Sequence, residues 1–293
     1  MGRIDILVIL VNYEGTQLTD ECIKSINNSS ISVDIMVIDN NSSDNSISQV
    51  CKFYNNVIFK KLDENIGFAG ANNIGFKYAI KHKYSYVMML NNDTVISDTL
   101  IQKLVNECND NQVSVPCMYY YDQPQKIYYA GGTVDKKRGT THHYGQDDIP
   151  LEVNDCFCDF ATGCCIMMTT KMISNIGYLD DTYFMYYEDT EYSIRMLKNG
   201  IKVKFVAEAK LWHKVGATAG KVDSPIGIYY GSRNRLYLIH DNLDFYSKTA
   251  LLYTIITRIA YFLRGTIMRK KNSGLYIRAI IDYNRGIKGK ITL

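Results

Sequence analysis

The sequence predicts an α/β fold in which helices flank a mostly parallel central sheet, with a helical extension at the C-terminal end. Three observations support this prediction. Short, continuous apolar runs alternate with segments of helical periodicity over residues 4–99. Several of these runs end in clusters of Asn and Asp, at the edge where parallel sheets bind their ligands. Beyond residue 227 the pattern is helical, in pieces, to the end of the chain.

The first half of the chain indicates successive βαβ units. The run at 4–11 is continuous and rich in β-branched residues, as in a parallel strand that is buried on both faces. The elements predicted next are a helix at 18–26, strands at 33–38 and 57–62, a helix ending near residue 81, a strand at 84–90 and a helix starting near residue 99. This alternation favours right-handed crossovers and a parallel sheet.

The second half is less regular. Residues 116–160 are rich in aromatics and glycines and indicate loops with short strands. The elements predicted after them are an apolar segment that follows a small-residue turn at 161–168, a helix from about 184 to 198, a strand at 203–207 and the C-terminal helices.

Composition excludes several classes of protein. Of 293 residues, 46% are hydrophobic and 22% charged, which suits a globular chain with a sizeable core and excludes a disordered one. The net charge of +3 is too small to indicate nucleic acid as a partner. The 8 cysteines follow no disulfide spacing and are typical of free thiols in a reducing cytosol, so we expect a cytoplasmic protein. No run reaches the ~18 uncharged apolar residues of a membrane span.

Polar clusters follow three of the predicted strands. They are 12–14 (Asn-Tyr-Glu), 39–44 (Asp-Asn-Asn-Ser-Ser-Asp) and 91–93 (Asn-Asn-Asp). Solvated loops are polar without being functional. Three clusters on one edge of a parallel sheet nevertheless favour a binding site there.

The third cluster contains a candidate metal ligand. Hard divalent cations prefer carboxylate oxygens and readily bridge a diphosphate, so Asp93 is placed to hold one. The alternative is that this cluster caps the helix predicted near Thr99.

Two adjacent acids, Glu188 and Asp189, lie at the start of a predicted helix, directly after the aromatic run 183–187. Aromatic walls reduce solvation and hold the pKa of a carboxylate nearer to a working pH, which suits a general base. The alternative is that these acids only cap the helix and interact with its dipole.

Two further side chains are candidates. His213 follows the only tryptophan, and a neutral imidazole can bind a metal or a phosphate, although a lone histidine is more often structural. Arg233 follows Tyr229 and Tyr230, and its planar cation suits a diphosphate or an acidic acceptor. The alternative for Arg233 is a solvated helix face.

Taken together, these motifs resemble the family 2 glycosyltransferases of the GT-A fold, a Rossmann-like fold, and especially the rhamnosyltransferase-like branch. The resemblance covers about residues 4–240. It depends on the order and spacing of the motifs at 11–13, 39–44, 65–73, 90–93, 188–189, 212–213 and 233–234.

The resemblance implies a role for each candidate. Asn12, Tyr13, Glu14, Asp39 and Asn41 would line the pocket for base and ribose, with Asn65 and Asn73 on the nucleotide side and Arg233 near the diphosphate. Asn92 and Asp93 stand where the family has its Asp-x-Asp motif, of which only the last position is acidic here. Asp93 would hold Mn²⁺ or Mg²⁺ with His213, and Asp189 would be the catalytic base, with Glu188 in reserve.

The implied activity is inverting sugar transfer to a hydroxyl of a cell-surface polysaccharide or a lipid-linked acceptor. We expect a pyrimidine nucleotide donor, with dTDP-rhamnose first and UDP-hexose or UDP-galactofuranose next. One alternative is a nucleotidyltransferase, but 12–15 lacks the basic, glycine-rich phosphate loop that such enzymes usually show. The other is a non-catalytic sugar- or nucleotide-binding module, which donor hydrolysis would exclude.

These considerations divide the chain into a catalytic domain at 1–240 and a basic, amphipathic helical region at 241–293. In 245–268 the apolar residues recur at helical spacing and mark one face, namely Leu251, Leu252, Ile255, Ile256, Ile259, Phe262 and Leu263. Such a helix can lie on the cytoplasmic face of an anionic membrane. Alternatively, this face packs on the catalytic domain or forms a homodimer.

Overall fold

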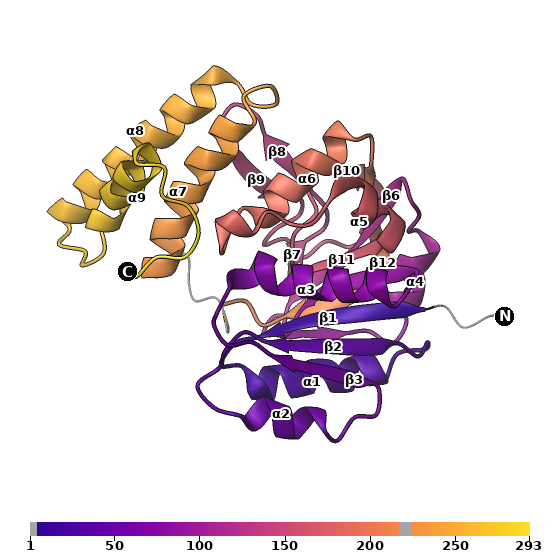
Figure 1. Ribbon diagram of the computed structural model, residues 1–293. Coiled ribbons are helices and arrows are strands. Elements are labelled where there is room, and N and C mark those ends of the chain that lie inside the picture. Colours follow the sequence, from indigo (N-terminus) through magenta and orange to yellow (C-terminus); the bar gives the residue numbers. More distant parts are fainter. Residues whose placement is uncertain (1–4, 217–223) are drawn as a thin grey trace.

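The structure, a computed structural model, describes residues 5–216 and 224–293 and is built on one mixed sheet (Figure 1). Ile4, the first residue of the first predicted strand, lies outside the described residues. The strand order is β10 (Cys156–Cys158), β12 (Lys202–His213), β6 (Gln112–Tyr120), β11 (Cys165–Thr169), β4 (Tyr86–Asn91), β1 (Ile6–Asn12), β2 (Asp34–Asp39) and β3 (Val57–Lys61). This is the α/β arrangement that the sequence predicts.

The half of the sheet that contains β1 is parallel. Strand β1 lies between β2 and β4, with Asn12 opposite Asp39 on one side and Val11 opposite Asn91 on the other. The carboxyl ends of the three strands therefore meet at one edge. The three polar clusters of the sequence are brought together there. This is the point in the sheet where the chain continues from β1 to β2 on one side and later adds β4 on the other side.

Helices cover both faces of this parallel half. α1 (Thr16–Asn27) and α2 (Ser46–Cys51) lie on one face and α3 (Gly67–Lys81) on the other (Figure 1). The side chains from Ile6 to Leu10 are completely or almost completely buried, which explains the uninterrupted apolar run in the sequence. α1 is amphipathic, and it turns Cys22, Ile23 and Ile26 toward the sheet.

The other half of the sheet contains antiparallel pairs. β11 runs antiparallel to both β4 and β6, and β12 runs parallel to β6. β12 bulges between Val206 and Lys210, and its end then pairs with the short strand β5 (Thr94–Ile96). This pairing sets His213 opposite Thr94 and hence beside the turn that holds Asp93.

The remaining small elements complete this half. β7 (Ile127–Tyr129) pairs with β6, while β8 (Gly132–Asp135) and β9 (Thr140–His143) form a separate hairpin. The helices here are α4 (Leu100–Asn106), α5 (Thr170–Ile176) and α6 (Glu188–Lys198), with a 3-10 turn at Asp181–Tyr183.

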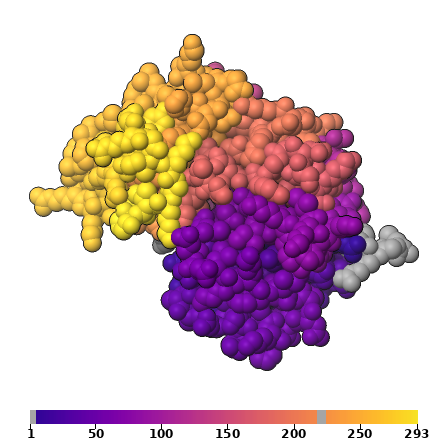
Figure 2. Space-filling view, in the orientation of Figure 1, coloured from indigo at the N-terminus to yellow at the C-terminus, as the bar shows by residue number. Residues whose placement is uncertain are grey.

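Three helices, α7 (Pro225–Asp241), α8 (Lys248–Ile267) and α9 (Gly274–Asn284), form the C-terminal part, which Figure 2 shows in orange and yellow. The predicted division at residue 240 falls at the end of α7. α7 packs on α8 and α9, while many of its own side chains are buried. The helical group therefore includes α7 as well as the predicted region 241–293.

The end of the chain returns to the sheet half of the molecule. Gly289 N donates to Thr182 O at 2.7 Å, and Lys290 Nζ donates to Asn65 O at 3.1 Å. A small apolar cluster made by Phe184, Tyr229, Tyr230 and Ala279 joins the loop before α6 to α7 and α9. The C-terminal helices thus hold a segment that leads directly to Glu188 and Asp189.

Among the described residues, α8 is the one helix long and apolar enough to cross a membrane, judged by length and composition alone. The sequence predicts no span, because Arg258 and Arg264 interrupt this helix and leave no uncharged run of ~18 residues. Only 17% of its most apolar window is buried, so α8 is largely a surface helix of the protein.

Candidate active site

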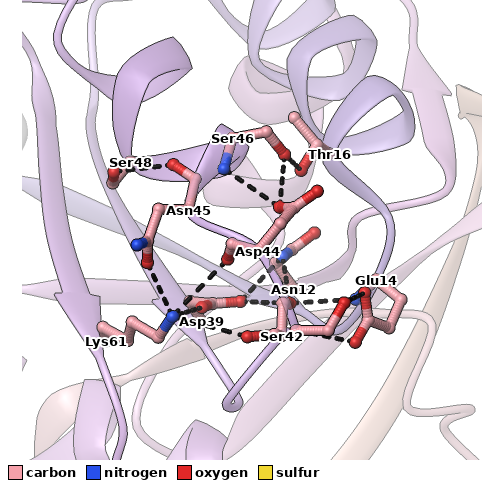
Figure 3. Close-up of polar contacts among 11 residues, drawn as sticks. Asn12, Glu14, Thr16, Asp39, Ser42, Asp44, Asn45, Ser46, Ser48 and Lys61 are labelled. Carbon is pink, nitrogen blue, oxygen red and sulfur yellow. Dashed lines mark hydrogen bonds and ion pairs between the residues drawn. The ribbon is translucent and has the colours of Figure 1, made fainter.

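Asn12, at the end of β1, is the centre of a network of side-chain hydrogen bonds (Figure 3). Its side chain is fully buried and donates from Nδ2 to Asp39 Oδ1 at 2.9 Å and to Ser42 Oγ at 3.1 Å. Its Oδ1 accepts a bond from Thr19 Oγ1 at 2.9 Å. Asn12 therefore orients Asp39 from inside the protein, and it does not face a ligand as the resemblance implied.

Asp39 keeps one carboxylate oxygen available. Oδ1 accepts from Asn12 and from Ser42 Oγ, the latter at 2.5 Å. Oδ2 is buried and has no hydrogen bond within the chain, and Lys61 Nζ lies 4.0 Å away. A buried acceptor without a donor is costly, so this oxygen is suited to a donor group of a ligand.

The loops after β1 and β2 meet beside Asp39. Glu14 accepts from Ser43 N at 2.7 Å and from Ser43 Oγ at 3.0 Å, and so bridges the loops after β1 and β2 (Figure 3). Tyr13 is 42% exposed, and Asn41 is exposed with a left-handed backbone. Tyr13 and Asn41 are thus free to contact a ligand.

The turn between β4 and β5 holds the predicted metal ligand. Asp93 Oδ1 lies 3.1 Å from Nε2 of His213, and both side chains are buried. Asn92 points inward and donates to Thr19 Oγ1 at 2.8 Å, so it supports the turn. The capping alternative is wrong, because α4 starts at Leu100 and has Thr99 at its N-cap position.

Asp93 and His213 together fit one divalent cation with a hard oxygen ligand and an imidazole ligand. In the described ranges 5–216 and 224–293, no cluster of three or more His, Cys, Asp or Glu could hold a metal. A cation at this pair would therefore depend on ligands from a bound diphosphate. Burial opposes a charged imidazole, but Cys164 and Asp93 raise the pKa of His213 to about 10. Without a cation His213 is therefore an imidazolium paired with Asp93, and a cation bound by both residues would have to displace its proton.

The loop before α6 is strained. Phe184, Tyr186 and Tyr187 have φ values of 61°, 67° and 76°, which are rare for aromatic residues. Such strain persists only where the surroundings impose it, and it concentrates at functional sites. Here the loop delivers Glu188 and Asp189 as the first two residues of α6.

Asn234 of α7 imposes this conformation. Its Nδ2 donates to three carbonyls of the loop, those of Tyr183 at 2.7 Å, Met185 at 2.8 Å and Tyr186 at 3.1 Å. Its Oδ1 accepts from Arg233 Nε at 3.1 Å and Nη2 at 3.0 Å.

The diphosphate role predicted for Arg233 is therefore wrong. The side chain is completely buried, and its guanidinium lies 5.2 Å from the Tyr229 ring centre and 4.9 Å from that of Tyr230. A cation between two aromatic faces is stabilised by their quadrupoles. Arg233 supports Asn234 and has no surface to offer a ligand.

The motif at 65–73 also holds the strained loop and the residues before it in place. Asn73 exchanges two hydrogen bonds with the backbone of Leu179, at 2.8 and 2.9 Å, and Phe68 N donates to Phe184 O at 2.9 Å. A side chain on Gly67, which has φ +81°, would collide with Phe184. The structure thus gives Asn73 a structural role in place of the predicted nucleotide contact.

Asn65 is used within the chain as well. Its Oδ1 accepts from Asn40 Nδ2 and from Gly67 N, both at 3.0 Å. Asn40, which the sequence analysis did not single out, is buried at the end of β2 and ties that strand to the start of α3. Asn40 lay inside a cluster already noted, but only the fold shows which Asn of that cluster turns inward.

The two acids have different surroundings. Asp189 Oδ2 accepts from Gly163 N at 2.9 Å, and Oδ1 accepts from Thr190 Oγ1 at 3.2 Å. Glu188 Oε2 is buried without a hydrogen bond within the chain. Burial, with the charge of Asp189 beside it, raises the pKa of Glu188 to about 8.

Burial also raises the pKa of Asp189, but the bonds from Gly163 and Thr190 oppose that rise. Glu188 is therefore mostly protonated at neutral pH and Asp189 is the better carboxylate. The pair thus has one member suited to accept a proton, and that member is the one predicted as the base.

Tyr128, which was not among the residues predicted for the site, lies near both Asp189 and the pair formed by Asp93 and His213. Its ring packs edge-on against His213, with ring centres 5.1 Å apart. Burial raises the pKa of Tyr128, and Asp189 and Asp93 are both close enough to raise it further. Asp93, His213 and Asp189 are therefore all near one tyrosine, which His213 contacts directly.

His143 is a further neighbour that sequence reasoning missed. Its Nδ1 lies 3.1 Å from Tyr128 O, and its charge influences Asp189. It lies at the end of β9, within a segment predicted as loops, so no motif pointed to it.

The fold and this site define a nucleotide-dependent transferase of the GT-A class, and comparison with known proteins agrees. Glycosyl transferase family 2 matches residues 7–176, so the chain belongs to that family and is a glycosyltransferase. This sets aside the nucleotidyltransferase and non-catalytic alternatives.

Two relatives and one solved structure are similar to most of the chain. The dTDP-rhamnosyl transferase RfbF of Shigella flexneri is 25% identical over 243 residues, which is 78% of each chain. The low-salt glycan biosynthesis hexosyltransferase Agl10 of Haloferax volcanii is 23% identical, over 86% of this chain and 81% of that protein. The mannosyltransferase PcManGT of Pyrobaculum calidifontis, solved with GDP-Man and Mn²⁺, has a TM-score of 0.61 at 10% identity and covers 97% of this chain and 88% of its own. The last likeness confirms the GT-A fold.

Proposed function

We propose that this protein is an inverting glycosyltransferase that uses Asp189 as its general base and Asp93 with His213 at the donor diphosphate. The observation that carries the proposal is the arrangement around Tyr128. It brings a carboxylate at a helix N-terminus and an acid–imidazole pair near the same side chain. These are the two functions that displacement of a diphosphate by a hydroxyl requires.

The chain's residues would act as follows. Asp189 accepts the proton of the acceptor hydroxyl, and the oxygen bonds to the anomeric carbon from the face opposite the diphosphate. The bond between that carbon and the diphosphate breaks, and its electron pair leaves with the diphosphate. A single displacement inverts the anomeric carbon. A Mn²⁺ or Mg²⁺ ion at Asp93 and His213 would neutralise the charge of the leaving group.

For the donor, we propose a pyrimidine nucleotide sugar, with dTDP-rhamnose first and UDP-hexose or UDP-galactofuranose next. The free Oδ2 of Asp39 supports this choice, because it can accept the N3–H that uracil and thymine carry and cytosine lacks. The similarity to a dTDP-rhamnosyl transferase supports the order of the donors.

A nucleotide panel tests the donor proposal. UDP or dTDP, with Mn²⁺, should raise the melting temperature more than CDP or GDP. The N3–H of uracil and thymine can donate to Asp39, whereas N3 of cytosine carries no hydrogen and guanine presents its donors on a larger purine ring. Asp39→Asn should remove that preference. The Asn side chain can accept from N3–H through its oxygen or, after its amide is flipped, donate to the unprotonated N3 of cytosine. A clear preference of the unaltered protein for a purine nucleotide would contradict the proposed donors.

For the acceptor and location, we propose a lipid-linked or surface glycan that is met at the cytoplasmic face of a membrane. The support is a stripe on α8, in which Leu252, Ile256, Ile259, Leu263 and Ile267 are 40–82% exposed. Leu251, Ile255 and Phe262 of the predicted face are instead partly covered by the protein. From residue 245 to 281 there are no acids, so the surface around the stripe suits anionic lipid.

Vesicle co-sedimentation tests this location. The double variant Ile256→Asp, Leu263→Asp should bind anionic vesicles at least about tenfold more weakly, because a buried Ile or Leu contributes about 1.5–3 kcal/mol. Leu243→Asp, at an exposed residue outside the stripe, should bind normally. If the unaltered protein ignores vesicles, or if the double variant only splits a dimer, the stripe is a protein interface.

A further inference from the structure

A cavity lies in the C-terminal part of the molecule, and neither Asp39 nor Asp93 lines it. It has a volume of about 630 Å³ and lies between the start of α7, the last turns of α8 and the turn into α9. Its walls include four cations and two tyrosines, namely Arg258, Arg264, Lys270, Lys271, Tyr261 and Tyr276. We call it the basic cavity.

The charge of the basic cavity is uncompensated. No Asp or Glu lines it, and in 5–216 and 224–293 no salt bridge joins any of the four cations to an acid. Asp282, the one acid after residue 244, contacts Arg278 at 3.5 Å and accepts from Tyr229 at 2.8 Å. Four like charges around one cavity repel each other unless an anion enters.

The guanidinium of Arg258 is held in place by neighbouring side chains and keeps a donor for such an anion. Its guanidinium stacks over Tyr261 at 5.2 Å and Tyr276 at 5.9 Å, and Nη1 donates to Ser232 Oγ at 3.4 Å. Its Nε is buried and has no hydrogen bond within the chain. Burial and the nearby charge of Arg235 lower the pKa of Arg258. An orientated guanidinium with a spare donor fits the oxygens of a phosphate group.

The basic cavity is connected to the loop before α6 through Arg258. Ser232, which Arg258 contacts, lies on α7 directly before Arg233 and Asn234. Arg235 and Arg258 are also close enough to Tyr187 to oppose the rise that burial causes in its pKa. Tyr187 immediately precedes Glu188 and Asp189. A ligand that contacts Arg258 would therefore lie near the segment that leads to the candidate base.

We propose that the basic cavity binds a phosphate or diphosphate group, separately from the diphosphate of the donor. Its volume exceeds what a diphosphate fills and leaves room for the first atoms attached to it. The group could belong to a lipid-linked acceptor or to an anionic phospholipid, and the chemistry is the same. Only the assignment to an acceptor depends on the proposed function.

Calorimetric titration of the full chain with inorganic pyrophosphate in EDTA tests the cavity itself. The unaltered protein should bind, and Arg264→Ala with Lys270→Ala should bind at least about tenfold more weakly, because the variant loses two cations that can donate charge-assisted hydrogen bonds to the phosphate oxygens. Both residues are exposed, so the fold should persist. Lys248→Ala, which removes an exposed charge of α8 outside the cavity, should bind normally. No binding, or equal binding by the double variant, would overturn the proposal.

The donor site must be excluded as the place of binding. Asp93→Ala should leave binding of pyrophosphate in EDTA unchanged. Without a metal, removal of this carboxylate would strengthen binding of an anion beside it, so tighter binding by the variant would overturn the proposal by placing the anion in the donor site. A protein that binds pyrophosphate through Arg264 and Lys270, yet releases no nucleotide from any donor, would contradict the proposed function and leave the basic cavity as a phosphate site.

The source of the phosphate group is identified by competition. Vesicles of neutral lipid should not displace bound pyrophosphate, and displacement by them would contradict a phosphate-specific site. Displacement by vesicles containing a polyprenyl diphosphate, but not by vesicles containing phosphatidylglycerol, identifies a lipid-linked acceptor. Equal displacement by both supports binding of a phospholipid headgroup in the same cavity.

Discussion

Replacing Asp189 by Asn should lower sugar transfer by at least about a hundredfold, the usual scale for loss of a general base. Donor binding should be unchanged, because Asn can still accept the bond from Gly163 N that positions Asp189. The measurement is the rate of transfer together with the donor dissociation constant for both proteins. Activity of the unaltered protein should fall as the pH drops through the pKa of Asp189, which burial raises above its ordinary value.

Glu188→Gln is the matched control for this experiment. Glu188 is mostly protonated at neutral pH, since its pKa is about 8, and Gln resembles a protonated Glu in size and charge. We expect it to retain most of the activity. If Glu188→Gln is inactive and Asp189→Asn transfers sugar normally, the base is the neighbouring residue. If both variants are active, the base lies elsewhere.

Replacing Asp93 by Ala should weaken metal-dependent donor binding at least about a hundredfold. Removing a residue that only hydrogen-bonds to a metal ligand already lowers metal affinity or activity about 10–100-fold, and Asp93 would be a ligand itself. Binding of the nucleoside alone should change little, because Asp39 and the loops beside it are separate from the β4–β5 turn. The measurement is calorimetric titration with nucleoside and with nucleotide sugar, each with Mn²⁺ and with EDTA.

Asp98→Ala removes an exposed acid from the segment just after β5 and should bind donor normally. If the unaltered protein binds donor equally well in Mn²⁺ and in EDTA, the diphosphate is neutralised without a metal at Asp93. The proposal that Asp93 and His213 bind a metal ion would then be wrong, while the roles proposed for Asp39 and Asp189 would be unaffected.

The parallel half of the fold was predictable because its strands are buried on both faces and therefore appear as continuous apolar runs. β6 was not predicted, because Pro116 lies inside it and proline is rare in central strands. β12 was predicted only in part, because its bulge brings Glu208 and Lys210 into the middle of an otherwise apolar strand.

The candidate site was predictable where chemistry sets the residue type, as at Asp93, His213 and Asp189. It was not predictable where the same residue type can face either way. Asn12 and Asn73 are polar residues in family motifs, yet both amides bond to other parts of the chain. Arg233 looked like a free cation, whereas the tyrosines one turn before it enclose its side chain.

Release of nucleoside diphosphate from a panel of nucleotide sugars, with acceptor-containing membranes and Mn²⁺, tests the central claim most directly. The account predicts release from a dTDP- or UDP-sugar by the unaltered protein, and at least about a hundredfold slower release by Asp189→Asn. Transferred sugar should carry the anomeric configuration opposite to that of the donor. Undiminished release by Asp189→Asn, or retention of configuration in the product, would contradict an inverting transferase that uses this base.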